Sequence, residues 1–285
     1  MKIGIALSGG GIRAIAHAGV LQALKDEKIK IDIIGGTSAG GMVASLYAMG
    51  FEPIDIYELF KKHSKEIVGE KKFPFISKLV KYSLNKNYPL TGFNNGESIE
   101  KVYNNLAKQK NIEKIEQIQM PIVIPTVDIQ KSKEYVFTNY IPKLAKDKSQ
   151  YITDISIGKA VRASSSFPAV FSPCKVNKYS FMDGGVLDNI PVNEVRKQGA
   201  DKIIAVKFDA DTIDEKSNVM DIAMKTIDIM GSKISEQSLE NSDYVLNVFT
   251  DKVGLLDIDK LDKCYNYGYQ SVIDNLEDIR RIFCE

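Results

Sequence analysis

The stretch IDIIGGTSAGGMVASLYAMG, residues 31–50, joins a short apolar run to a helix-like segment through a cluster of small residues. Its centre, GTSAG, has the G-x-S-x-G spacing of a nucleophile elbow, in which a serine occupies a sharp turn between a strand and a helix. Glycine-sized residues two positions on either side, Gly36 and Gly40, let the strand and the helix approach each other. The hydroxyl of Ser38 is then exposed at a helix N-terminus, where negative charge is favoured. The alternative is an ordinary strand-to-helix turn with Ser38 as its N-cap.

Outward from this turn, short apolar runs alternate with segments whose apolar residues recur every three or four positions. The predicted strands are residues 3–7, 31–36, 121–129, 134–138, 201–208 and 243–249. The predicted helices are residues 12–27, 38–50, 97–108, 155–163, 191–198, 218–240 and 257–282. This alternation favours an α/β fold, a three-layer αβα sandwich with a mainly parallel central sheet. We expect one domain over residues 1–285, with a helical cap or insertion around residues 50–110.

The composition is that of a globular protein with balanced charge. Lysine and arginine total 38 against 37 acidic residues, a formal net charge of +1, so we expect no nucleic-acid partner. Cys174, Cys264 and Cys284 are widely spaced and lack companion histidines, which predicts neither disulfides nor a zinc site. We expect no metal and no organic cofactor. Because no signal-peptide core and no apolar run of transmembrane length is evident, we expect a cytoplasmic protein.

A second glycine cluster, LSGGGIRAIAHAGV at residues 7–20, has two interpretations. Gly9, Gly11 and Ala14 have the G-x-G-x-x-G/A spacing of a dinucleotide-binding loop. That fold would end its second strand with an acidic residue, whereas Asp32 stands near the start of its run and the run ends in glycines. Three consecutive glycines instead offer unhindered N–H groups that converge on an oxyanion, so we prefer an oxyanion hole.

A serine nucleophile needs a base, and the sequence holds only two histidines. His17 falls inside the helix after the glycine loop and His63 in a lysine-rich segment, so structural and solvated roles are expected for them. The better-placed group is Asp183 in YSFMDGGVLDNIP, which ends an apolar run and precedes Gly184 and Gly185. Its side chain can project from a tight turn with little steric cover. The alternative for this stretch is an Asp-Gly hairpin turn.

Four stretches now stand in order: GGGIRAIAHAGVLQAL at 9–24, GTSAGG at 36–41, ASSSFPAVFSP at 163–173 and DGGVLDNIP at 183–191. Together they resemble the patatin-like phospholipase family over essentially the whole chain. The resemblance implies that Ser38 is the nucleophile and Asp183 the general base. It also implies an oxyanion and substrate-binding set made of Gly9, Gly10, Gly11, Arg13 and Ala39. The elbow and turn glycines are Gly36, Gly40, Gly184 and Gly185. Ala14 departs from the pattern, since many relatives carry glycine there.

The predicted chemistry is acyl transfer from a lipid or phospholipid ester to water. Asp183 takes the proton of Ser38, Ser38 attacks the ester carbonyl, and loop N–H groups hold the oxyanion. Because an aspartate has a reference pKa of about 3.9, the site must be dehydrated or the hydrogen bond short. An acyltransferase or thioesterase on the same dyad stays open. A nucleotide- or acyl-CoA-binding protein that uses the glycine loop is less favoured, because it leaves GTSAGG and DGG unexplained.

Residues 61–90 hold eight lysines against two glutamates, with Phe73, Phe75, Tyr82 and Tyr88 interleaved. This composition predicts peripheral contact with a membrane surface through the segment 61–90. The alternative is a solvated lysine-rich helix and loop. Arg13 has two alternative roles as well: it orients a phosphate head group, or it braces the glycine loop.

Overall fold

The computed structural model describes residues 1–68, 94–168, 170–209, 219–251, 253–254 and 257–284. The strands are β1 (Ile3–Leu7), β2 (Ile33–Gly36), β3 (Ile122–Asp128), β4 (Lys133–Thr138), β5 (Tyr151–Ile152), β6 (Cys174–Val176), β7 (Tyr179–Asp183), β8 (Lys202–Phe208) and β9 (Tyr244–Val248). The α-helices are α1 (Ala16–Asp26), α2 (Ala39–Ala48), α3 (Pro53–Val68), α5 (Glu97–Gln109), α6 (Ile157–Ser164), α7 (Val192–Lys197), α8 (Val219–Leu239), α9 (Leu261–Asp274) and α10 (Leu276–Phe283). Short 3₁₀ helices are η1 (Gly11–Ile15), η2 (Ile115–Gln117), η3 (Lys148–Gln150), η4 (Gly184–Val186) and η5 (Ile258–Lys260).

The described strands form one mixed sheet in the order β5-β4-β3-β2-β1-β8-β9. The neighbours β3, β2, β1, β8 and β9 are parallel, which confirms the mainly parallel sheet. β3 also pairs antiparallel with β4 and β7, and β6 pairs antiparallel with β7. Because β1 and β2 are parallel, the turns that follow them, both rich in glycine, emerge at the same edge of the sheet.

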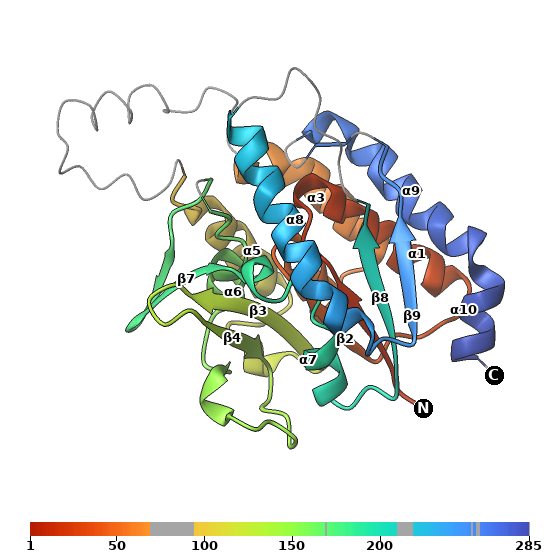
Figure 1. The fold of residues 1–285 in the computed structure, drawn as a ribbon, viewed down its shortest axis with the longest axis horizontal. Helices are drawn as coiled ribbons and strands as arrows, with labels where there is room; N and C mark the ends of the chain where they lie inside the picture. Colours follow the sequence, from red (N-terminus) through yellow and green to blue (C-terminus); the bar gives the residue numbers. More distant parts are fainter. Residues whose placement is uncertain (69–93, 169, 210–218, 252, 255–256, 285) are drawn as a thin grey trace.

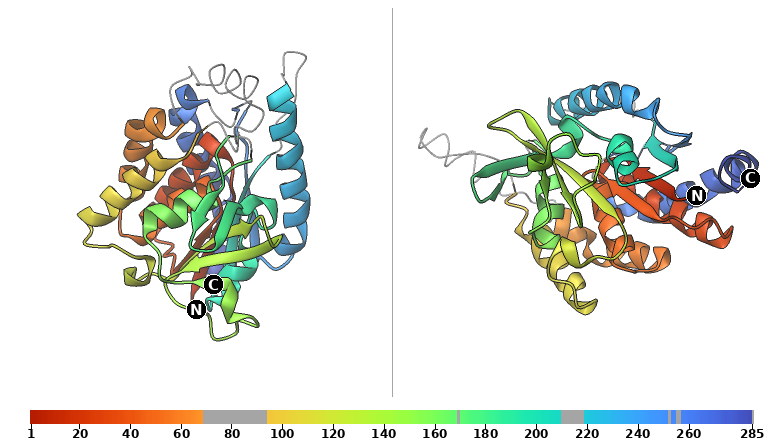
Figure 2. Two further views of the ribbon diagram at one scale, coloured as in Figure 1. Left: turned by 90° about the vertical axis from the view of Figure 1, so that its left-hand side faces the viewer. Right: turned by 90° about the horizontal axis from the view of Figure 1, so that it is seen from below.

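Helices cover both faces of the sheet, as predicted (Figure 1). Helices α1, α3 and α9 lie on one side and α8 on the other, which Figure 2 shows from below. The buried apolar residues form two clusters, a larger and a smaller one. Successive side chains of β1 contribute to different clusters: Ile5 to the larger one, and Ala6 to the smaller one, together with Val195 of α7. Every residue of β1 is buried, which explains why its sequence is a continuous apolar run.

Several elements depart from the predicted ones. Strands β5, β6 and β7 were not predicted as strands, and the predicted helix 257–282 is two helices that meet at Asn275. Helices α3 and α5 lie within residues 50–110, where a helical cap or insertion was expected. Most of the lysine-rich segment, residues 69–90, lies outside the described residues, and this includes Phe73, Phe75, Tyr82 and Tyr88. In the part of the chain that is described, no helix has both the length and the apolar character needed to cross a bilayer.

Candidate active site

Ser38 occupies a strained turn between β2 and α2. Its φ of 54° and ψ of −124° are outside the regions that non-glycine residues ordinarily adopt. The turn is so tight that a Cβ on Gly36 would lie 2.4 Å from the carbonyl oxygen of Gly40. A Cβ on Gly40 would lie 2.5 Å from the carbonyl oxygen of Ser8, in the loop after β1. The two glycines are therefore needed on steric grounds, and Ser38 makes no side-chain cap to α2.

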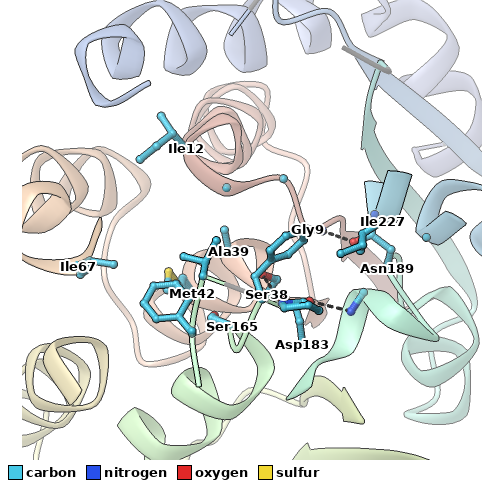
Figure 3. A pocket seen from close by; sticks show the side chains of 18 of the residues that line it. Gly9, Ile12, Ser38, Ala39, Met42, Ile67, Ser165, Asp183, Asn189 and Ile227 are labelled. Atoms are coloured by element: carbon cyan, nitrogen blue, oxygen red, sulfur yellow. Dashed lines mark hydrogen bonds between the residues drawn. The ribbon is translucent and has the colours of Figure 1, made fainter. Parts of the chain in front are cut away.

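The hydroxyl of Ser38 faces the carboxylate of Asp183. Ser38 Oγ donates to Asp183 Oδ2 at 2.6 Å, and the N–H of Gly185 donates to Asp183 Oδ1 at 2.8 Å (Figure 3). Asp183 ends β7, which is fixed against β3 by the pairing of Asp183 with Thr126. Burial raises the pKa of Asp183 to about 6, although the hydrogen bonds from Ser38 and Gly185 act to lower it. The carboxyl group is thus a stronger base than an exposed aspartate.

The DGG stretch does not form a hairpin turn. β7 leads at Asp183 directly into η4. β7 forms a hairpin with the preceding strand β6, so the hairpin turn lies before Tyr179, where Asn177 has a positive φ of 51°. A Cβ on Gly184 would lie 2.4 Å from the carbonyl oxygen of Pro125, so the close approach to β3 requires glycine here. The turn therefore presents the Asp183 carboxylate to Ser38.

The glycine loop after β1 lies against the elbow. A Cβ on Gly9 would be only 3.3 Å from Cβ of Ser38. The N–H of Gly9 donates to Asn189, to the carbonyl oxygen at 3.2 Å and to Oδ1 at 3.1 Å. Among the described residues, the N–H groups of Gly10, Gly11 and Ala39 have no hydrogen-bond acceptor. These residues line the same pocket as Ser38, so their N–H groups are the ones left for a ligand oxygen.

Arg13 supports the loop from behind. Its side chain is buried, and Nε donates to the carbonyl oxygen of Gly10 at 3.3 Å. A terminal nitrogen donates to the carbonyl oxygen of Asp209 at 3.2 Å, and the guanidinium lies over the ring of Phe208. Of the two roles expected for Arg13, these contacts favour bracing the loop, and Arg13 is not among the residues that line the pocket around Ser38.

Neither histidine makes a hydrogen bond to Ser38. His17 is fully buried, and its Nε2 lies 2.9 Å from the carbonyl oxygen of Ser8. Burial lowers the pKa of His17 to about 4, against an opposing effect of that hydrogen bond. His63 lies on α3, where Nδ1 is 3.3 Å from Oε2 of Glu66. The titratable side chain that does make a hydrogen bond to Ser38 is Asp183.

Two polar residues of this region were not singled out from the sequence. The hydroxyl of Ser164 accepts from the N–H of Ser38 at 3.0 Å and donates to the carbonyl oxygen of Pro125 at 2.6 Å. It thereby links the elbow to β3. Asn189 links the glycine loop to the segment that carries Asp183. Both residues lie in stretches that carry the family resemblance, ASSSFPAVFSP and DGGVLDNIP, which was the available signal.

The pocket above Ser38 is mainly apolar. Its wall comes from η1, α2, α3, the segment after α6 and α8, and includes Ile12, Met42, Phe60, Ile67, Phe171 and Ile227. Figure 3 shows Ile12, Met42 and Ile67 to one side of Ser38, with Asp183 and Asn189 on the other. Such a wall suits an acyl chain that ends at the serine. Within the described ranges, no group of three histidine, cysteine or acidic side chains is arranged to hold a metal ion.

Comparison with known proteins gives a consistent result. A family model for patatin-like phospholipases matches residues 5–196. Lysophospholipase NTE1 of Yarrowia lipolytica is 32% identical over 213 residues, which cover 75% of this chain and 13% of that protein. Lysophospholipase NTE1 of Candida albicans is 28% identical over 305 residues, which cover 97% of this chain and 20% of that protein. The chain therefore spans a fifth or less of the length of these curated relatives.

A solved structure supports the fold. The crystal structure of VipD from Legionella pneumophila is similar to this chain with a TM-score of 0.53 and 17% identity, and the match covers 97% of this chain and 67% of that one. The resemblance expected from the motifs is thus confirmed by sequence and by fold. Because the family model covers more than half of the chain, including the glycine loop, Ser38 and Asp183, the chain belongs to the patatin-like phospholipase family.

Proposed function

We propose that the chain is a serine acyl hydrolase that cleaves fatty-acyl esters of phospholipids or other lipids. One observation carries this proposal: Ser38 Oγ donates to the buried carboxylate of Asp183 at 2.6 Å, in the wall of an apolar pocket. A serine needs a proton acceptor to become a nucleophile, and this geometry supplies one. An acyl chain in the pocket would keep water away from the pair and strengthen its electrostatic interactions.

The reaction proceeds in two acyl transfers. Asp183 takes the proton of Ser38 while Oγ bonds to the ester carbonyl carbon, and the oxyanion is held by the N–H groups of Gly10 and Gly11. Asp183 then gives this proton to the departing alcohol as the ester C–O bond breaks. In the second transfer Asp183 takes a proton from water while the water oxygen attacks the acyl-serine carbonyl carbon. Asp183 then gives this proton to Ser38 Oγ as the bond between Oγ and the acyl carbon breaks, which releases the fatty acid and restores the Ser38 hydroxyl. A pKa of about 6 places Asp183 close to neutral pH, where a base of this kind works best.

The relatives suggest where to look for a substrate. The two NTE1 proteins carry the name lysophospholipase, so we propose a lysophospholipid as the first lipid to assay. A bound nucleotide is not supported, because the pocket wall is mainly apolar. Contact with a membrane surface through residues 61–90 and a cytoplasmic location stay predictions. For the first of these, residues 69–90 lie outside the described residues.

The test uses the wild type, Ser38→Ala and Asp183→Asn, with matched controls that keep the pocket unchanged. Ser45→Ala removes a buried hydroxyl of α2 that donates to the carbonyl oxygen of Met42. Asp128→Asn changes a buried carboxylate at the end of β3. Fatty acid released from lysophosphatidylcholine and nitrophenol released from a p-nitrophenyl ester report hydrolysis, and a fluorophosphonate probe reports the reactive serine.

We expect hydrolysis and labelling in the wild type and both controls, and their loss in Ser38→Ala and Asp183→Asn. Hydrolysis that persists in Ser38→Ala would refute the proposed nucleophile. Full activity in Asp183→Asn would mean that another group takes the proton. A wild type that neither hydrolyses esters nor reacts with the probe would refute the function itself.

A further inference from the structure

The peptide group between Ser8 and Gly9 is held from both of its ends. Its carbonyl oxygen lies 2.9 Å from Nε2 of His17. Its N–H donates to Asn189, to the carbonyl oxygen at 3.2 Å and to Oδ1 at 3.1 Å. A trans peptide is planar, and its C=O and N–H point in opposite directions. Anchors at both ends therefore fix the rotation of the whole peptide plane.

This peptide needs anchors because it begins a run of three glycines. Without Cβ atoms, the peptide planes of Gly9, Gly10 and Gly11 rotate with little steric resistance. An oxyanion hole works only if its N–H groups already point at the place where charge develops. Rotation of the Ser8–Gly9 plane would change the direction of the next N–H, that of Gly10, which lines the pocket and has no acceptor among the described residues.

A third anchor acts one step further along the loop. Nε of Arg13 donates to the carbonyl oxygen of Gly10, so the N–H of Gly11, on the same peptide, points the opposite way. Gly10 and Gly11 both line the pocket. The loop is thus fixed at its first peptide by His17 and Asn189, and at the Gly10–Gly11 peptide by Arg13.

The chemistry of His17 suits an anchor. Its neighbour is a carbonyl oxygen, so Nε2 carries the proton and donates. Burial lowers the pKa of His17 to about 4, so the ring is neutral near pH 7 and keeps one tautomer. The ring of Phe208 lies 4.7 Å from it, centroid to centroid, and a Cβ on Gly10 would be 2.6 Å from Phe208. His17 is therefore held in place by packing.

Asn189 connects the loop to the base. It lies six residues after Asp183 in the same segment, and a Cβ on Gly185 would be 3.0 Å from Asn189 Oδ1. The segment that presents the carboxylate to Ser38 thus also accepts the N–H of Gly9. We propose that His17 and Asn189 are positioning residues, which hold the Ser8–Gly9 peptide and thereby aim the N–H groups of Gly10 and Gly11 at the oxyanion. This inference rests on the proposed function.

The test compares His17→Leu, His17→Gln and Asn189→Ala with the wild type, using a p-nitrophenyl ester. Loss of an entire oxyanion donor costs about 100-fold to 1000-fold in kcat, so a donor that is present but wrongly aimed should cost about 10-fold to 100-fold, with KM changed less than about threefold. His17→Gln keeps an N–H donor near the position of Nε2 and should recover most of kcat. Reaction with the fluorophosphonate should slow in parallel, because its phosphoryl oxygen uses the same N–H groups.

Two further readouts separate positioning from loss of structure. The acidic limb of the pH profile is set by Asp183 and should not move in any of these variants. Because His17 and Asn189 hold the same peptide, the double variant His17→Leu with Asn189→Ala should lose less than the product of the two single losses. Gln198→Leu is the matched control. Gln198 lies just before β8, at the edge of the sheet opposite the Ser38 pocket, and its buried side chain donates to the hydroxyl of Thr138. This variant should keep the kcat of the wild type.

An active wild type with unchanged kcat in both His17→Leu and Asn189→Ala would overturn the inference and leave the proposed function standing. Equal losses in His17→Leu and His17→Gln, or a shifted acidic limb, would overturn it in favour of a structural role. A wild type without hydrolysis or labelling would refute the proposed function, and the inference with it.

Discussion

The buried carboxylate of Asp183 should make the protein less stable at the pH where it works. Burial raises its pKa to about 6 from the ordinary aspartate value of 3.8. The folded state therefore binds this proton more tightly than the unfolded state does. Below pH 3.8 the carboxyl group is protonated in both the folded and the unfolded state, so it does not lower the free energy of unfolding. This free energy falls as the pH rises from 3.8 towards 6. Above pH 6 the whole difference of about 2 pKa units applies, which corresponds to about 3 kcal/mol.

Asp183→Asn removes this cost because an amide is neutral at every pH. Asparagine keeps the local hydrogen bonds: Oδ1 still accepts from Gly185, and Nδ2 donates to the hydroxyl of Ser38. We expect the free energy of unfolding to exceed that of the wild type by up to about 3 kcal/mol at pH 8 and by about 1 kcal/mol at pH 4.5. The same variant should lose ester hydrolysis.

Urea unfolding followed by circular dichroism at the two pH values measures this difference. Asp147→Asn is the control, because hydrogen bonds from Lys133 and Ser149 lower the pKa of Asp147 to about 2, and its loss should bring no gain at pH 8. An equal gain for Asp183→Asn at pH 4.5 and pH 8, or a less stable variant at pH 8, would refute the reasoning. It would mean that Asp183 is not a carboxylate that burial disfavours.

Three other predictions concern the same fold. In the wild type, kcat/KM should fall about tenfold between pH 7 and pH 5, because a base with a pKa of about 6 becomes protonated; a flat acid profile would argue against Asp183 as the base. Gly40→Ala should lower kcat about 100-fold, because its Cβ would lie 2.5 Å from the carbonyl oxygen of Ser8. Gly254→Ala is the control and should keep activity, because the nearest atom to its Cβ would be 3.5 Å away. Gly268→Ala should lower the free energy of unfolding by about 1–3 kcal/mol, because a Cβ there would lie 1.8 Å from the carbonyl oxygen of Ala16, where α9 packs against α1. A denaturant titration measures this change. An unchanged unfolding midpoint would show that the two helices move apart without a loss of stability.

The central strands and the elbow were predictable because their causes are mostly local. β1 is buried on both faces and is therefore a continuous apolar run, and the clash at Gly36 involves Gly40, four residues away. Strands β5 and β6 are two and three residues long, too short for a periodic pattern, and are held by pairing with neighbours. Predicting β7 would have required knowing that it pairs with β3, whose register sets Thr126 opposite Asp183.

By itself, the sequence determined the strand and helix alternation, the ordered motifs of the family, and Ser38 and Asp183 as candidates. Local residue types set backbone conformation and the periodicity of burial, and these patterns can be read along the chain. Only the tertiary structure decided that Ser38 and Asp183, 145 residues apart, share a hydrogen bond of 2.6 Å. It also decided that Arg13 donates to the carbonyl oxygen of Gly10, that the pKa of His17 falls to about 4 and that the pKa of Asp183 rises to about 6. The physical reason is that desolvation and hydrogen-bond partners depend on which distant segments the fold brings together.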